Sequence, residues 1–187
     1  KDYQLVEMVE NGDNLLITAT AGAGKSFFAK YFLKAILATA RRIPVFFELR
    51  NFQSSKGDLT DQLLQDLKAS GLQLTSESFY ELLKTDRFVI ILDGYDEVAE
   101  DLLDKVNKGL LEILDAGCKC SVVLTSRPDE KLEYLTTFKN YRVLPLSQTQ
   151  AATLIEKLNY DKTVKQKFLE NLERGLFQKH HDFLSNP

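Results

Sequence analysis

The chain has 187 residues, 44% of them hydrophobic, which suits one globular domain with a core of its own. Lysine and arginine total 24 against 27 aspartate and glutamate, a formal net charge of −3. This balance does not favour nucleic acid or an anionic membrane as a partner. The longest uncharged stretches, residues 14–24 and 143–155, are shorter than the roughly 18 residues that a membrane helix requires. We therefore expect no membrane segment.

The two cysteines, Cys118 and Cys120, precede an apolar run. No second pair completes a zinc site, and two thiols make no framework of disulfides. We interpret them as reduced thiols of a cytoplasmic protein, with a metal or redox role as the alternative. The chain opens at Lys1 and stops at Pro187, from which we expect a piece of a longer protein.

Five short apolar runs predict strands, because near-continuous runs of Val, Ile, Leu and Phe are typical of strands covered on both faces. They fall at residues 15–19, 43–49, 88–93, 121–125 and 141–146. The main helical patterns between and after them fall at residues 28–37, 59–69, 102–114 and 150–158. Strands that alternate with helices pair in parallel through right-handed crossovers. The predicted fold is therefore α/β, a three-layer sandwich with a mainly parallel five-stranded sheet.

The strand signal disappears after about residue 147, and helical patterns take over. We expect residues 1–147 to form the α/β core and residues 148–187 to be the beginning of a helical subdomain. His180 and His181 lie in this last part with no nucleophile nearby. A surface or capping role is expected for them rather than catalysis.

A glycine-rich string, Ala-Thr-Ala-Gly-Ala-Gly-Lys-Ser, occupies residues 19–26, between the first predicted strand and the first helix. A Walker A pattern is specific when it lies between a strand and a helix, as this string is predicted to do, although Ala19 stands where the pattern has its first glycine. Backbone N–H groups of such a loop curl around a phosphate, and the helix dipole adds positive charge. Lys25 would contact the β- and γ-phosphates, and Ser26 would be a ligand of Mg2+. The alternative is a glycine-rich turn with a solvated lysine. The predicted nucleotide contacts are Thr20, Ala21, Gly22, Ala23, Gly24, Lys25, Ser26 and Phe27.

The apolar run at residues 88–93 ends in Asp93 and is followed by Gly-Tyr-Asp-Glu, which is a Walker B pattern. A carboxylate at the carboxyl end of a parallel strand lies at the same rim of the sheet as the phosphate loop. Asp93 can hold the Mg2+ shell there. Asp96 or Glu97 would then orient the attacking water. The alternative for both residues is a solvated helix N-terminus.

Arg127 follows the run at residues 121–125 and precedes Pro128, which holds it out of helical geometry. If this strand lies between the phosphate-loop strand and the Asp93 strand, Arg127 reaches the γ-phosphate and distinguishes ATP from ADP. The alternative is a surface ion pair with Asp129 or Glu130. The Asn-Lys-x-Asp signature of guanine recognition does not occur, so adenine is the predicted base.

Four strings resemble, in order and spacing, the signatures of NACHT domains over roughly residues 12–187. They are Ala-Gly-Ala-Gly-Lys-Ser at 21–26, Ile-Pro-Val-Phe-Phe-Glu-Leu-Arg at 43–50, Leu-Asp-Gly-Tyr-Asp-Glu at 92–97 and Leu-Thr-Ser-Arg-Pro at 124–128. The resemblance implies a P-loop NTPase sandwich of the STAND class. In that class ATP opens a closed, ADP-bound protomer, which then oligomerises and activates an attached effector. NACHT proteins serve in innate immunity, including bacterial defence against phage.

The resemblance also implies a role for Pro187, which matches the proline that lies against adenine in the family's Asn-Pro motif. The first functional hypothesis is therefore a regulatory ATPase of low turnover that binds ATP/ADP and Mg2+. It would self-oligomerise in the full-length protein, with effector and sensor domains outside this chain. The second hypothesis is a dedicated enzyme, such as a small-molecule kinase or a motor ATPase. The third is a binding module that holds no nucleotide.

Overall fold

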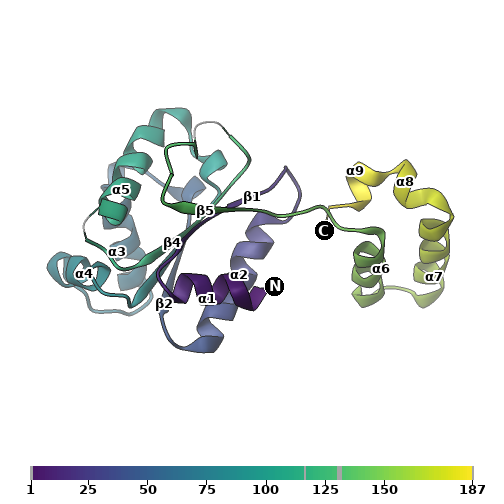
Figure 1. Cartoon of the computed structure of the whole chain (residues 1–187), viewed down its shortest axis with the longest axis horizontal. Helices are drawn as coiled ribbons and strands as arrows, with labels where there is room; N and C mark the ends of the chain where they lie inside the picture. Colours follow the sequence, from purple (N-terminus) through teal and green to yellow (C-terminus); the bar gives the residue numbers. More distant parts are fainter. Residues whose placement is uncertain (1, 116, 130–131, 187) are drawn as a thin grey trace.

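The computed structural model describes residues 2–115, 117–129 and 132–186, and its centre is a five-stranded sheet in the order β2-β3-β4-β1-β5 (Figure 1). Every neighbouring pair is parallel, so the predicted α/β fold is confirmed. The first four strands lie within a residue of the predicted positions. The strands are β1 Asn14–Thr18, β2 Ile43–Glu48, β3 Phe88–Asp93, β4 Ser121–Ser126 and β5 Phe138–Arg142.

The fifth strand was predicted at residues 141–146, and this position is wrong. β5 is Phe138–Arg142, and it lies at the edge of the sheet beside β1. Only Phe138 in it is buried, so the strand carries none of the continuous apolar signal of a strand covered on both faces. The apolar residues that follow it belong to the connection to the next helix, where Leu144 is 75% exposed.

Helices cover both faces of the sheet and form two separate cores. One face carries α1 Asp2–Glu10 and α2 Lys25–Thr39, and the other carries α3 Leu59–Ala69, α4 Ser76–Leu83 and α5 Leu103–Asp115. Successive residues of β3 point into opposite cores. Val89 and Ile91 pack on the α2 side, and Ile90 and Leu92 pack on the other side. α1 and α4 were not predicted from the sequence.

Within the described residues the sheet is followed by α6 Gln148–Lys157, α7 Lys162–Asn171, the π-helical segment Leu172–Leu176, α8 Phe177–Lys179 and α9 His181–Leu184. Figure 1 shows them beside the sheet, joined to it by the stretch after β5. Their own small core contains Ala151, Leu172 and Phe177. The end of this helical segment lies beside the stretch that leads into it, because Leu146 N donates a hydrogen bond to Ser185 O at 2.7 Å. No helix among the described residues is long and apolar enough to cross a bilayer.

Helices α3 and α5 approach each other closely at Gly109. A Cβ atom on this residue would lie 2.6 Å from Leu59 Cβ, which is inside van der Waals contact. Leu59 is fully buried and begins α3 directly after the capping box of Asp58 and Asp61. The absence of a side chain at Gly109 therefore sets the distance between the two helices.

The substitution Gly109→Ala tests this packing. Alanine in place of glycine normally stabilises a helix interior by about 1 kcal/mol, but here the added methyl group overpacks the contact with Leu59. We expect a loss of roughly 1–3 kcal/mol in the free energy of unfolding, measured by urea denaturation. The exposed neighbour Lys108→Ala is the control and should change stability by less than about 0.5 kcal/mol. A more stable Gly109→Ala variant would contradict the packing described.

Candidate functional site

The glycine-rich loop runs from the end of β1 at Thr18 to the start of α2 at Lys25. Gly22 and Gly24 have positive φ angles of 75° and 84°, a conformation that glycine adopts without strain. Ala19 N donates to Ser126 O at 3.1 Å, and Ala23 N donates to Thr20 O at 3.2 Å. No side chain of the described residues caps α2 at Gly24. The first N–H groups of this 15-residue helix are therefore open to an anion.

The residues predicted to contact nucleotide differ in exposure. Thr20, Ala21 and Gly22 are exposed, Ala23 is buried, and Gly24, Lys25 and Ser26 are intermediate. The ring of Phe27 is 74% exposed. Pro187 lies outside the described residues, but Asn186 before it is described. The Nδ2 atom of Asn186 lies 3.5 Å from the position of a Cβ built on Gly22, so Asn186 lies against the phosphate loop.

Asp93 ends the fully buried strand β3 and is itself 4% exposed. Thr125 Oγ1 donates to Asp93 Oδ1 at 2.5 Å and accepts from Gly94 N at 2.9 Å. Gly94 has a φ of 81°, and a Cβ on it would lie 3.2 Å from Glu97 Cδ. Glycine after the aspartate is thus required by the turn. Thr125 was not predicted as a site residue, although it begins the Thr-Ser-Arg-Pro string at residues 125–128.

Asp96 joins the loop to the tip of β4. Its carboxylate lies 3.3 Å from Lys25 Nζ and 2.8 Å from Arg127 Nε. Arg127 N also donates to Asp96 Oδ1 at 2.9 Å. The side chains of Lys25 and Asp96 are only 10% and 11% exposed. Arg127, for which a surface pairing was the alternative, therefore points to the same carboxylate as the loop lysine.

β4 lies between β1 and β3. This is the strand order for which Arg127 was predicted to lie near the phosphate loop. Thr125 pairs with Ile17 of β1 and bonds to Asp93, while Lys25 bonds to Asp96. The Asp93 turn is thus connected to β1 through Thr125 and to the start of α2 through the Lys25–Asp96 contact.

A second charged group lies at the end of β2. Arg50 Nη2 donates to Glu48 Oε2 at 2.7 Å, and Arg50 Nη1 lies 3.9 Å from Glu97 Oε2. The hydrogen bond from Arg50 is the main reason that the pKa of Glu48 lies below its usual value, and Lys30 at 3.4 Å adds to the effect. Glu48 stands opposite Asp93 in the β2–β3 register. Arg50 was not predicted as a site residue, because its contact with Glu97 joins segments that follow separate strands and leaves no pattern in the sequence.

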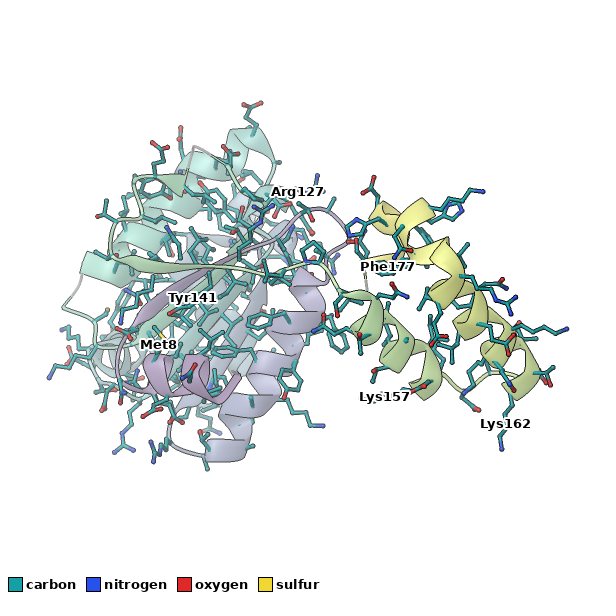
Figure 2. The ribbon with its side chains drawn as sticks, turned by 45° about the vertical axis from the view of Figure 1, so that its right-hand side comes forward. Met8, Arg127, Tyr141, Lys157, Lys162 and Phe177 are labelled. Carbon is teal, nitrogen blue, oxygen red and sulfur yellow. The ribbon has the colours of Figure 1, made fainter. Side chains whose placement is uncertain are left out.

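A groove of about 960 Å3 lies beside the loop, between α1, the start of α2 and the end of β5. Figure 2 shows Met8 of α1 and Tyr141 of β5 near each other, and Tyr141 Oη donates to Met8 Sδ at 3.3 Å. The groove combines apolar walls with a few amides, which suits a flat organic ring. Its lining residues are Gln4, Leu5, Glu7, Met8, Asn11, Ile17, Phe28, Tyr141, Arg142, Val143, Leu144 and Gln150.

The histidines and cysteines lie apart from this group. His181 packs edge-on against Phe177 with ring centres 5.4 Å apart and lies 3.6 Å from Asp182, within the C-terminal helices. Cys118 and Cys120 are free thiols before β4. Burial raises the pKa of Cys120 to about 12 and also raises the pKa of Cys118. Both thiols are therefore protonated at neutral pH and poorly nucleophilic.

The strand, the glycine-rich loop, the helix and the neighbouring acidic strand together define a P-loop NTPase fold. The family model of the NACHT domain matches residues 13–162, and the chain belongs to this family. Membership supports nucleoside triphosphatase activity. No curated protein sequence matches significantly.

Solved structures share the fold at low sequence identity. DnaA from Aquifex aeolicus bound to AMPPCP is 15% identical, with a TM-score of 0.58 over 96% of this chain and 64% of that chain. A DNA replication initiation factor is 14% identical, with a TM-score of 0.59 over 98% and 61%. Cdc6p from Pyrobaculum aerophilum is 14% identical, with a TM-score of 0.54 over 83% and 46%. The chain thus spans between 46% and 64% of the length of these proteins.

The residues present fit a magnesium ion. Ser26 and Asp93 offer hydroxyl and carboxylate oxygens, which are the donors Mg2+ prefers, and nucleotide sites need only one or two protein ligands beside phosphate and water. Asp93 Oδ1 is held by Thr125. Asp93 Oδ2 makes no hydrogen bond with another residue of the described ranges, so it remains available to the ion's shell.

The substitution Asp96→Asn tests the contacts at the loop. It removes the negative charge between Lys25 and Arg127 while keeping the shape, so the buried lysine loses its counter-charge. We expect the nucleotide-free protein to lose roughly 1–3 kcal/mol of stability, seen as a lower melting temperature. Glu81→Gln, which breaks the exposed pair with Lys84, is the control and should change little. Equal effects of the two substitutions would argue against a buried charge cluster.

Proposed function

We propose that this chain is the ATP-binding and slowly hydrolysing regulatory domain of a NACHT protein. The proposal rests on one observation: two cationic side chains contact the same carboxylate beside the phosphate loop. Lys25 and Arg127 lie 3.3 Å and 2.8 Å from Asp96 oxygens, beside the open N–H groups of α2. A triphosphate would meet the helix dipole, the lysine and the arginine together. Arg127 would favour ATP over ADP by contacting the γ-phosphate.

The magnesium ion supplies charge neutralisation to the β- and γ-phosphates when it is bound. Ser26 would be its protein ligand, and Asp93 would hold the ion's shell from the end of β3. The loop residues Thr20, Ala21, Gly22, Ala23 and Gly24 would surround the phosphates with their backbone. Phe27, whose ring is exposed, would contribute its backbone from the first turn of α2.

Among the two acids of the turn, Glu97 is the better candidate for orienting the attacking water. Asp96 is occupied by Lys25 and Arg127, whereas Glu97 is 40% exposed and has only a 3.9 Å contact with Arg50 within the part of the chain that the structure describes. Asp96 would instead position the two cations. This division gives each carboxylate one role.

The groove beside the loop is proposed to hold adenine. Its apolar walls come from both sides of the loop, and Asn186 lies against Gly22. We propose that residues 1–147 form the nucleotide-binding core and residues 148–187 the beginning of a helical subdomain. If both parts contact the nucleotide, exchange of ADP for ATP would change how the two parts are arranged relative to each other.

In the full-length protein, this coupling would control self-oligomerisation and an attached effector. We infer a cytoplasmic protein, with innate immune or anti-phage defence as the setting that the family supports. The charge balance does not favour nucleic acid as a partner, although DNA is bound by some proteins of similar fold, such as DnaA with single-stranded DNA.

Calorimetric titrations with ATP and with inorganic tripolyphosphate, both with Mg2+, test the proposal. Lys25→Ala should abolish binding of both ligands, because both need the lysine. Met8→Ala removes an apolar wall of the groove and should weaken ATP about tenfold, or 1.4 kcal/mol, while tripolyphosphate is unaffected. Tyr31→Ala, on the exposed side of α2, is the matched control. Unchanged binding by Lys25→Ala would overturn the proposed function, and equal losses for both ligands in Met8→Ala would remove the adenine assignment.

Single-turnover hydrolysis tests the role of Glu97. Glu97→Gln should retain MgATP affinity within about threefold and slow hydrolysis by at least about 100-fold, the range expected for a general base. Glu77→Gln on the exposed side of α4 controls for loss of a carboxylate. A Glu97→Gln rate equal to that of the parent would exclude this role. Rapid steady-state turnover by the parent without an activator would argue for a dedicated ATPase rather than a switch.

A further inference from the structure

The hydroxyl of Thr125 is fully buried at the end of β4 and joins the two residues of the Asp-Gly turn. It lies 2.5 Å from Asp93 Oδ1 and 2.9 Å from Gly94 N. The sheet fixes its place, since Leu124 before it pairs with Leu92 of β3 and Thr125 itself pairs with Ile17 of β1. β4 lies between β3 and β1, so Thr125 contacts the Asp93–Gly94 turn from the strand next to the one that leads into the phosphate loop.

The direction of the two hydrogen bonds follows from the chemistry of the partners. The backbone N–H of Gly94 can only donate, so Thr125 Oγ1 is its acceptor. An ionised carboxylate can only accept, so the single hydroxyl proton of Thr125 goes to Asp93 Oδ1. Threonine is β-branched and has restricted rotation at χ1. One oxygen of Asp93 is thus held in a fixed direction by a group that cannot easily turn away.

We propose that Thr125 is a positioning residue for magnesium, which holds Asp93 so that Oδ2 faces the ion's shell. This inference rests on the proposed function, because it concerns the same phosphate site. Outer hydrogen bonds of this kind orient a metal-binding carboxylate, and their loss typically lowers metal affinity 10- to 100-fold. Thr125 acts through Asp93 and needs no contact with the nucleotide.

A purely structural role would be to satisfy a buried carboxylate oxygen and a buried N–H group. The next residue, Ser126, is a control for this structural role on the same strand. Ser126 is also fully buried, and its hydroxyl has no hydrogen-bond partner among the described residues. The two residues therefore form a matched pair on one strand, and only the Thr125 hydroxyl reaches Asp93.

The experiment measures ATP affinity by calorimetry twice for each variant, once with excess EDTA and once with Mg2+. The ratio of the two affinities is the magnesium gain. Thr125→Val keeps the shape and removes the hydroxyl, so we expect its affinity in EDTA to stay within about twofold and its magnesium gain to fall by at least tenfold. Thr125→Ser keeps the hydroxyl and should restore most of the gain. Ser126→Ala should equal the parent.

A Thr125→Val protein that keeps the full magnesium gain overturns the inference while leaving the proposed function in place. Equal losses of affinity in EDTA and in Mg2+ also overturn it, because they indicate general damage to the site. A parent protein without any magnesium gain overturns both proposals together. If Thr125→Val does not fold, judged by circular dichroism, Thr125→Ala takes its place, with direct binding of Mn2+ to the ATP complex followed by electron paramagnetic resonance. Weakened Mn2+ binding supports the inference, and unchanged binding overturns it.

Discussion

The carboxylate of Asp96 between Lys25 and Arg127 is the interaction on which the site depends. A lysine at 10% exposure needs a counter-charge, because an unpaired buried cation costs several kcal/mol. Asp96 supplies this charge. Under the proposed function, a phosphate would take its place beside Lys25 and Arg127. The backbone hydrogen bond from Arg127 N to Asp96 Oδ1 also holds the arginine beside this carboxylate.

The sheet brings these groups together through its strand order. β4 lies between β1 and β3, and all three end at one rim, where the loop, the Asp93 turn and Arg127 meet. The segment after the C-terminal helices reaches this rim, since Asn186 lies against Gly22 and Ser185 O accepts a hydrogen bond from Leu146 N. A movement of these helices would therefore change the surroundings of the phosphate loop directly. The proposed nucleotide-dependent switch would act through this connection.

Much of the fold, and the grouping of the glycine-rich loop with Asp96 and Arg127, were predictable because the signals are local. Buried parallel strands give continuous apolar runs, and the glycine-rich loop and the Asp-Gly pair need particular backbone angles that only certain residues adopt. β5 was misplaced because an edge strand with one buried residue lacks that signal. α1 and α4 were missed because they are short, and their stability comes from packing rather than from pattern. Thr125 and Arg50 depend on contacts between separate strands, which spacing along the chain does not reveal.

The crystal structure of this chain with Mg2+ and a non-hydrolysable ATP analogue tests the central claim most directly. The account predicts that Lys25 Nζ leaves Asp96 for a phosphate oxygen, that Ser26 Oγ contacts the ion, and that Asp93 faces the ion's shell. A nucleotide bound elsewhere, with the Lys25–Asp96 pair still in place, would contradict it.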